Sequence, residues 1–262
     1  MLNRRALLAA AGATGVMTLP GLQTAQSASA ASERQLYELR QYQLASAEQQ
    51  AGLDAFLRDA AIPAWNRMGI TPVGVFHAAE GVSPSYVLLT HSSLESVLTA
   101  TQKMLGDAEY LRQGATFLNA PADKPAFQRV ESALLLAFRG MPKLETPVKN
   151  PGRVFQLRIY ESPSVKTGQK KIEMFNDAGE ITIFRRVGLN PVFFGEAIIG
   201  AKLPNLTYML GFESEEQLKA GWKKFGADPD WQRLRGMEEY ADKAILCGIT
   251  NLVLKPAEFS QI

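Results

Sequence analysis

The 262-residue sequence contains few of the side chains on which metal sites, disulfides and histidine chemistry depend. It has one cysteine, Cys247, and two histidines, His77 and His91. A single cysteine excludes a disulfide within the chain. Because Cys247 lies in the apolar stretch AILCGI, we expect a buried and inert thiol. No Cys-x-x-Cys or His-x-x-x-His pattern is present, so no metal site is predicted.

The motifs of several common enzyme classes are absent as well. The sequence has no Gly-rich phosphate loop, no Gly-x-Ser-x-Gly motif and no His-Glu-x-x-His motif. These absences argue against nucleotide hydrolysis and against the common hydrolase mechanisms. Beyond the N-terminal segment, no apolar run is long enough to cross a bilayer, so no membrane anchor is expected.

The first thirty residues have the features of an export signal. Arg4 and Arg5 precede a weakly hydrophobic stretch rich in Ala and Gly, and Ala28 and Ala30 form a small-x-small cleavage pattern. The paired arginines favour a twin-arginine signal, and an ordinary secretory signal is the alternative. We expect cleavage near Ala30 and a periplasmic or secreted product.

The rest of the chain has no excess of charge of either sign. The sequence has 28 basic and 26 acidic residues, and the first thirty residues contain two arginines and no acid. Removing them leaves 26 residues of each sign. Nucleic-acid binding requires a basic excess on one face, so nucleic acid is not an expected partner.

The sequence beyond residue 30 is made of two related halves. Arg40 and Arg158 stand at the centres of YELRQY and FQLRIY. Four pairs of blocks match in the same order: Tyr37–Tyr42 with Phe155–Tyr160, Arg67–Val73 with Arg186–Val192, Ser85–Leu89 with Thr207–Gly211, and Pro125–Val130 with Pro229–Leu234. We predict an export signal over residues 1–30, a first module over 31–140, a linker over 141–152 and a second module over 153–262.

Each half predicts the order βαββαβ, which is the ferredoxin-like pattern of an α+β fold. Strands are expected at Leu36–Leu44, Pro72–Ala78, Tyr86–His91 and Ala133–Phe138, and at Val154–Glu161, Pro191–Ile198, Thr207–Phe212 and Thr250–Leu254. Helical spacing of apolar residues lies between these strands. Ser46 and Asp228 are expected to cap helices, and Gly69 and Gly188 are expected to end them.

The repeated arginine lies in a strand with two different faces. Alternation places Phe155, Leu157 and Ile159 on one face and Gln156, Arg158 and Tyr160 on the other. We expect the apolar face to cover the helices, as a core requires. If the two modules join their bare faces, both arginines line an enclosed space.

Several blocks together resemble the NIPSNAP family. They are YELRQY, FQLRIY, the two R-x-G-x-x-P-V blocks, DPDW and the terminal LKPAEFS. The resemblance covers nearly all of the chain beyond the signal. It departs from the pattern in the first half, where Ala126 and Phe127 stand in place of the Asp-Trp pair.

The resemblance implies a fold more than a function. The family is assigned to the dimeric α+β barrel superfamily, in which two ferredoxin-like modules pair their sheets. Here one chain supplies both modules, which implies an intramolecular barrel. The family has no generally established catalytic activity, and its eukaryotic members are linked to mitochondria and vesicle traffic. Related barrels include small monooxygenases and haem-handling enzymes, but a fold does not carry a function with it.

The two arginines are the first candidates for a ligand-binding site. In a partly dry cavity a guanidinium holds a carboxylate or phosphate through two hydrogen bonds. Glu38 lies two residues from Arg40 on the same face and is expected to neutralise it. Arg158 is flanked by Gln156 instead of an acid, so Arg158 is the better candidate.

Four tyrosines and one histidine complete the candidate set: Tyr42, Tyr86, Tyr160, Tyr208 and His77. Phenols in a cavity either orient a ligand or simply fill space with the hydroxyl hydrogen-bonded. A functional His77 would serve as a haem ligand or as a general base. The alternative, which is commoner for histidines at strand ends, is that His77 and His91 are partly exposed and have no such role.

The interpretation that we favour is an exported protein whose barrel binds a small anionic or amphipathic molecule. The alternative is an oxidoreductase, either cofactor-independent or haem-linked, of the same barrel superfamily. A third interpretation is a protein-interaction module that works through its outer helices. No cofactor is predicted, and haem would be required only by the haem-linked alternative. A homo-oligomer is compatible with each interpretation.

Overall fold

The structure is a computed structural model that describes residues 34–262. The expected export signal, with Arg4, Arg5, Ala28 and Ala30, lies outside the described residues and stays a prediction. Within residues 34–262, no helix combines the length and the apolar character that crossing a membrane requires.

The first repeat has the order βαββαβ. Its strands are β1 (Leu36–Gln43), β2 (Gly74–Ala78), β3 (Ser85–His91) and β4 (Arg129–Ala137). After β1, α2 (Ala47–Phe56) continues through a π-helical turn, η1 (Leu57–Ala61), into α3 (Ile62–Arg67). After β3 come α4 (Leu94–Leu105), α5 (Ala108–Gln113) and α6 (Ala115–Leu118).

The second repeat has the same order. Its strands are β5 (Val154–Glu161), β6 (Asn190–Ile199), β7 (Asn205–Phe212) and β8 (Gly248–Pro256). Helices α7 (Val165–Asn176) and α8 (Glu180–Val187) follow β5. After β7 come α9 (Glu215–Ala227), α10 (Pro229–Arg235), the 3-10 turn η2 (Glu238–Tyr240) and α11 (Asp242–Ile245). The predicted fold class, two tandem ferredoxin-like modules of an α+β fold, is confirmed.

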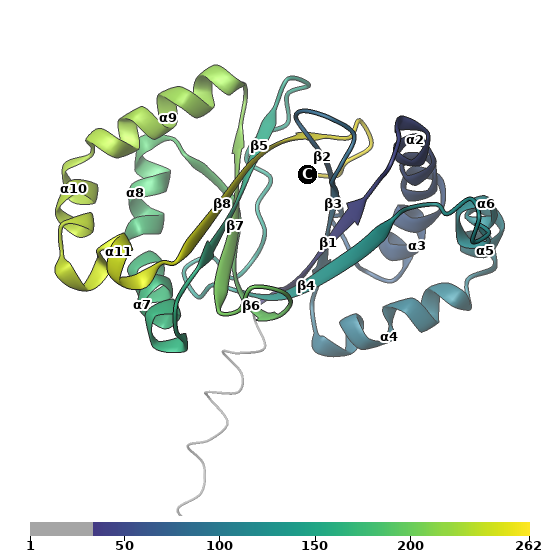
Figure 1. The fold of residues 1–262 in the computed structure, drawn as a ribbon, viewed down its shortest axis with the longest axis horizontal. Coiled ribbons are helices and arrows are strands. Elements are labelled where there is room, and N and C mark those ends of the chain that lie inside the picture. The colour runs from purple at the N-terminus through teal and green to yellow at the C-terminus, as the bar shows by residue number, and fades with distance from the viewer. Residues whose placement is uncertain (1–33) are drawn as a thin grey trace, which may run out of the picture.

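The eight strands form one closed antiparallel barrel in the order β1-β3-β2-β8-β5-β7-β6-β4. Two seams join the repeats: β2 pairs with β8, and β4 pairs with β6. The helices of the first repeat lie on one side of the barrel and those of the second repeat on the other (Figure 1). The intramolecular barrel is therefore closed by hydrogen bonds between the repeats, edge to edge.

The expected helix signals are present. The Ser46 hydroxyl accepts a hydrogen bond from the Gln49 N–H and caps α2. Asp228 caps α10 by accepting from the N–H groups of Asp230 and Trp231. Gly69 and Gly188 follow helices with φ of 76° and 84°, a left-handed conformation that glycine adopts without steric cost.

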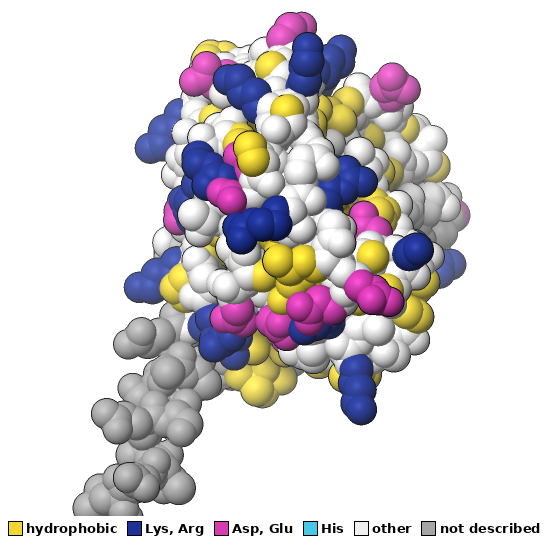
Figure 2. Space-filling model, turned by 90° about the vertical axis from the view of Figure 1, so that its left-hand side faces the viewer, with side chains coloured by type: hydrophobic (Ala, Val, Ile, Leu, Met, Phe, Trp, Pro, Cys, Tyr) yellow, Lys and Arg dark blue, Asp and Glu magenta, His cyan; other side chains and the backbone are white. Residues whose placement is uncertain are grey.

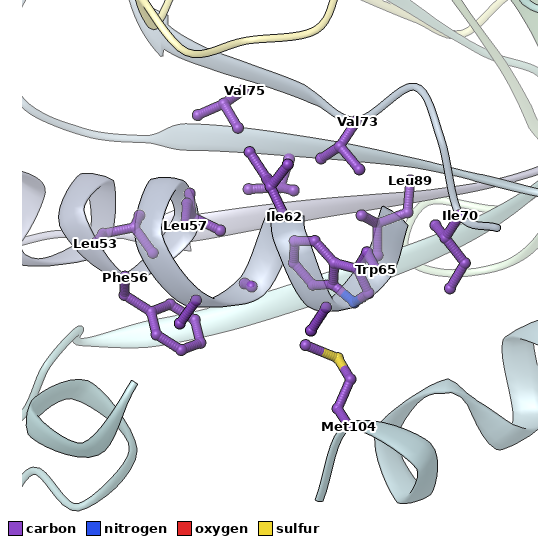
Figure 3. Packing of buried hydrophobic residues seen from close by; sticks show 14 of the residues in the cluster. Leu53, Phe56, Leu57, Ile62, Trp65, Ile70, Val73, Val75, Leu89 and Met104 are labelled. Atoms are coloured by element: carbon purple, nitrogen blue, oxygen red, sulfur yellow. The ribbon is translucent and has the colours of Figure 1, made fainter. Parts of the chain in front are cut away.

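Apolar side chains from all eight strands fill the barrel interior. The cluster includes Tyr37, Leu39, Phe76, Leu88, Leu135, Phe155, Leu157, Phe193, Met209 and Leu254. A second layer of apolar residues lies between each sheet and its helices. In the first repeat, Trp65 and Leu57 of the helices pack against Val75 and Leu89 of the sheet (Figure 3).

The expected assignment of the two strand faces is wrong. Phe155 and Leu157 point into the barrel, whereas Tyr160 belongs to the cluster under the helices and Gln156 contacts Trp222 of α9. Both faces of β5 are buried, so alternation separates the two sets of residues but does not say which set points inward. The interior of an eight-stranded barrel is narrow enough for side chains to fill, and here the apolar set fills it.

The expected match of Ser85–Leu89 with Thr207–Gly211 is wrong by one residue. Arg40 lies opposite Val87 on β3, and Arg158 lies opposite Tyr208 on β7. Val87 is therefore the counterpart of Tyr208. A shift of one residue moves a side chain to the other face of a sheet. Tyr86 accordingly points into the barrel, and Tyr208 lies under the helices.

The fourth pair of blocks is also not equivalent. Pro125–Val130 leads into β4, whereas Pro229–Leu234 forms most of α10. The counterpart of Asp228 is Asp107, since each caps the next helix and each pairs with the arginine of an R-x-G-x-x-P-V block. The substitution of the Asp-Trp pair at Ala126 and Phe127 therefore has no structural meaning.

Cys247 is exposed, and the expectation of a buried thiol is wrong. The apolar stretch around it is the turn between α11 and β8. Ile245 is buried there, while the Cys247 N–H donates to the Glu161 carbonyl and the side chain faces solvent.

Candidate functional site

In the first repeat Arg40 is neutralised by Glu38, as expected. The Arg40 Nε and Nη2 groups donate to the two carboxylate oxygens at 2.6 and 3.1 Å. The Ser132 hydroxyl donates to the same carboxylate at 3.0 Å, and His91 Nε2 lies 3.6 Å from it. Burial raises the pKa of Glu38, but the proximity of His91, the hydrogen bonds from Arg40 and Ser132 and the charge of Arg40 outweigh this effect and lower the pKa to about 2.

In the second repeat Arg158 has no such partner. Within residues 34–262 it forms no ion pair and no side-chain hydrogen bond, and its buried Nε lacks an acceptor. The guanidinium lies over two aromatic rings instead, at 4.6 Å from the Trp222 centroid and 5.3 Å from that of Tyr160. Such contacts stabilise a cation without cancelling its charge.

Gln156 occupies the position that Glu38 has in the first repeat. It is buried, and its Oε1 accepts a hydrogen bond from the Trp222 indole at 2.6 Å. Because an indole N–H can only donate, this contact fixes the orientation of the amide. The NH2 group of Gln156 therefore points away from Trp222 as a donor, on the same strand face as Arg158.

Arg158 lies beside exposed positions of β8. Arg158 is half-buried, and Asn251 lies directly opposite it on β8. Residues that pair across adjacent strands share a face, so the Asn251 side chain is a neighbour of Arg158. Asn251 is exposed, as is Ile249, which is 50% accessible on the same face. Three side chains with N–H donors and no carboxylate therefore share this face.

The tyrosines of the candidate set do not form one site. Tyr160 and Tyr208 are buried together beside Arg158, with hydroxyl oxygens 2.9 Å apart. Burial raises the pKa of Tyr160 to about 12 and raises the pKa of Tyr208 well above its ordinary value. Tyr42 packs edge-on against Phe127 in the first repeat. Tyr86 lies inside the barrel, where burial raises its pKa to about 12.

A buried ion pair that was not predicted from the sequence lies near this site. Lys171 of α7 and Glu180 of α8 are 1% and 2% exposed, with Nζ and Oε2 3.3 Å apart. Lys171 Nζ also lies 5.5 Å from the Tyr160 ring. Burial raises the pKa of Glu180, and Lys171 opposes that shift. The signal was available in the repeat, because Leu53 stands at the position of Lys171.

His77 does not fit the role of a haem ligand. Its Nδ1 lies 2.8 Å from the Ser85 hydroxyl and its Nε2 lies 3.3 Å from Asp54, so both ring nitrogens are engaged. Ser85 is fully buried and cannot act as a nucleophile. His91 is fully buried, which corrects the expectation of a partly exposed side chain. Across the described part of the chain, no three His, Cys, Asp or Glu side chains gather as a metal ion would require.

Two hollows lie on the outside of the barrel, apart from Arg158. One of about 320 Å³ opens between α7 and the connection from β6 to β7, with Gln169 and Glu196 at its wall. The other, of about 640 Å³, opens between α2 and residues 113–126. On the side that carries the second-repeat helices, basic and acidic side chains are interspersed and no field of one sign covers the surface (Figure 2).

Comparison with known proteins gives a family and a fold. The family model described as NIPSNAP matches residues 37–139 and 155–261, one match for each repeat. No curated protein matches the chain in sequence. A NIPSNAP-like domain protein from Burkholderia xenovorans is 21% identical over 43% of this chain and 92% of its own, with a TM-score of 0.38.

Two solved structures match both repeats at once. A "putative monooxygenase" from Fusobacterium nucleatum is 8% identical, with a TM-score of 0.57, over 85% of this chain and 92% of its own. A "putative monooxygenase" from Lactobacillus acidophilus is 9% identical, with a TM-score of 0.57, over 85% of this chain and 94% of its own. At these identities the likeness concerns the fold alone.

Proposed function

This protein belongs to the NIPSNAP family, and we propose that its second repeat binds a small anionic molecule at Arg158. One observation carries the proposal. The same arginine occurs in both repeats, but Glu38 neutralises it in the first and Gln156 replaces that acid in the second. A half-buried guanidinium without a carboxylate partner is costly unless an anion completes it. The binding site is thus under the edge of the helices, not inside the barrel.

The surroundings of Arg158 define the class of ligand. The guanidinium and the amides of Gln156 and Asn251 offer donors for a carboxylate or phosphate. The rings of Trp222 and Tyr160 form an apolar wall beside them. A molecule with one anionic group and a planar or apolar body fits this combination.

The test compares the arginine of each repeat. Native mass spectrometry of protein from its own host identifies a bound molecule, and benzoate serves as a probe beside its neutral isostere benzamide. We expect Arg158→Met to weaken benzoate binding by about 1.5–3 kcal/mol, the usual range for a hydrogen bond to a charged group. Arg40→Met should leave binding intact and lower the melting temperature, because Glu38 loses its partner.

A second variant probes the same site without removing the arginine. Gln156→Glu recreates the Glu-Arg pair of the first repeat and should abolish benzoate binding. If Arg158→Met and Gln156→Glu both bind benzoate as tightly as the wild type, while either melts several degrees lower, Arg158 has a structural role only and the proposal fails.

The second candidate function is that of an oxidoreductase that works without a cofactor. The hydrogen-bonded pair of Tyr160 and Tyr208 beside the anion site favours it, as does the fold shared with proteins named as putative monooxygenases. Oxygen uptake on addition of the molecule identified by mass spectrometry, and its loss in Tyr160→Phe, would support this function. A Soret band in the purified protein would point to haem instead.

We also propose that the protein is exported. The support is the sequence pattern of the first thirty residues, with Arg4 and Arg5 before the apolar stretch. Replacing both arginines by lysine should block the twin-arginine route and leave the melting temperature of the folded protein unchanged. Normal periplasmic yield of that variant would exclude the twin-arginine signal.

A further inference from the structure

The two repeats differ in what covers the outer side of their first helix. In the second repeat, the segment of η2 and α11 packs against α7. Tyr240 is buried there and its hydroxyl donates to Glu173 at 2.7 Å. Lys170 lies over the Tyr240 ring at 5.0 Å and pairs with Glu239 at 2.6 Å. An aromatic ring and a carboxylate thus occupy the space beside a basic helix.

In the first repeat α6 contacts α2 and Gln49 donates to the Pro125 carbonyl, but the space beside Gly52 stays open. Ser46 and Ser164 cap α2 and α7, and this correspondence places Gly52 and Ala55 where the second repeat has Lys170 and Glu173. A Cβ atom added to Gly52 would meet nothing within 4 Å. The hollow of about 640 Å³ between α2 and residues 113–126 results. Its size is that of a small-molecule site.

The lining of the hollow combines aromatic rings with carboxylates. The rings of Phe56 and Phe117 stack at 4.1 Å between centroids. Three carboxylates and one ammonium group line the hollow, namely those of Glu48, Asp59, Asp123 and Lys124. Glu48 pairs with Lys124 and Asp59 with its neighbour Arg58, both on the exposed surface. Exposed pairs of this kind are weak, and Asp123 forms no ion pair within residues 34–262.

We propose that this hollow binds a small organic cation with a flat aromatic body. The charges are reversed relative to the second repeat, where an acidic segment covers a basic helix. Carboxylates at the rim attract the cation. Phe56 is buried and covers one face of Phe117, so the half-exposed remainder of the Phe117 ring is the aromatic surface that meets the ligand. The hollow and the Arg158 site lie in different repeats, so this inference does not depend on the proposed function.

The experiment uses two probes with the same ring and opposite charge. Titration calorimetry of the full chain with tryptamine and with indole-3-propionate measures the preference for a cation. We expect tryptamine to bind at least about tenfold more tightly. Gly52→Lys places the lysine of the second repeat into the hollow and should abolish tryptamine binding. Asp123→Asn should reduce the preference for the cation.

The matched control is Gly226→Lys in α9. A Cβ atom at Gly226 also meets nothing within 4 Å, so the variant adds the same side chain and charge away from the hollow. It should bind tryptamine like the wild type, and both lysine variants should keep the melting temperature. Equal affinity for the two probes, wild-type binding by Gly52→Lys, or no saturation with tryptamine below about 10 mM would overturn the proposal.

Discussion

At the scale of the residue, Glu38 and its counterpart Gln156 set the charge around the neighbouring arginine. Glu38 accepts hydrogen bonds from Arg40 Nε and Nη2 and from the Ser132 hydroxyl, so the charge of Arg40 is neutralised within the protein. Gln156 uses its carbonyl oxygen on Trp222 and leaves Arg158 without an ion pair among the described residues, and the nearest buried carboxylate, Glu180, is paired with Lys171. In the function proposed above, this single change from acid to amide turns the arginine of a structural ion pair into a binding group.

The pKa of Glu38 gives a prediction for stability against pH. Its pKa is lowered from 4.5 to about 2 in the folded protein, so the carboxylate stabilises the fold above pH 4.5 and this contribution is lost as the pH falls towards 2. The contribution is on the order of 3 kcal/mol. In Glu38→Gln, unfolding free energies from urea titrations at pH 7, 5 and 3 should vary less with pH than in the wild type. An unchanged difference between pH 5 and pH 3 would show that other carboxylates carry the acid sensitivity.

At the scale of the element, the sequence predicts strand and helix positions well and their faces poorly. Caps such as Ser46 and stops such as Gly188 are local signals, and local signals fix where an element begins and ends. Which face of β5 points into the barrel depends on how all eight strands pair and on which helices cover the sheet. That arrangement cannot be read from the sequence of one strand. The same holds for Tyr86 and Tyr208, whose faces differ through a shift of one residue in β3 relative to β7.

The contact between α7 and α8 supplies the prediction at this scale. Lys171 forms a buried ion pair with Glu180, whereas the first repeat has Leu53 at the position of Lys171. A protein with a buried ion pair is rarely more stable than the same protein with apolar side chains in its place. We expect Lys171→Leu alone to lose about 3–5 kcal/mol of unfolding free energy, because Glu180 is left buried without a cation. Adding Glu180→Ala should restore the wild-type value or exceed it by about 1–4 kcal/mol.

Urea unfolding of the two single variants and the double variant forms a complete cycle. A double variant less stable than the wild type would mean that the pair stabilises the fold on balance relative to its apolar replacement. In that case no functional reason is needed for its burial. A restored double variant leaves function as the reason for a charged pair beside Tyr160 and Arg158.

At the scale of the whole molecule, the repeats are joined through their hydrogen bonds and through a shared interior. The segment Ser260–Ile262 follows β8 and lies along β2 of the other repeat. The Val75 N–H donates to the Ser260 hydroxyl and the Val73 N–H to the Gln261 side chain. Ile262 is 3% exposed and belongs to the interior cluster. The two repeats therefore share one core and should unfold as one unit.

Ile262→Ala tests this unity, because it removes an interior side chain that the second repeat places beside β2. We expect a loss of about 2–5 kcal/mol, the usual cost of truncating a buried isoleucine. The fluorescence of Trp65 reports on the first repeat, and that of Trp222 and Trp231 reports on the second. Variants that keep only Trp65, or only Trp222 and Trp231, separate the two fluorescence signals. Both signals should shift to the same lower urea midpoint. If the Trp65 signal shifts alone, the seams between β2 and β8 and between β4 and β6 do not couple the repeats, and each module folds by itself.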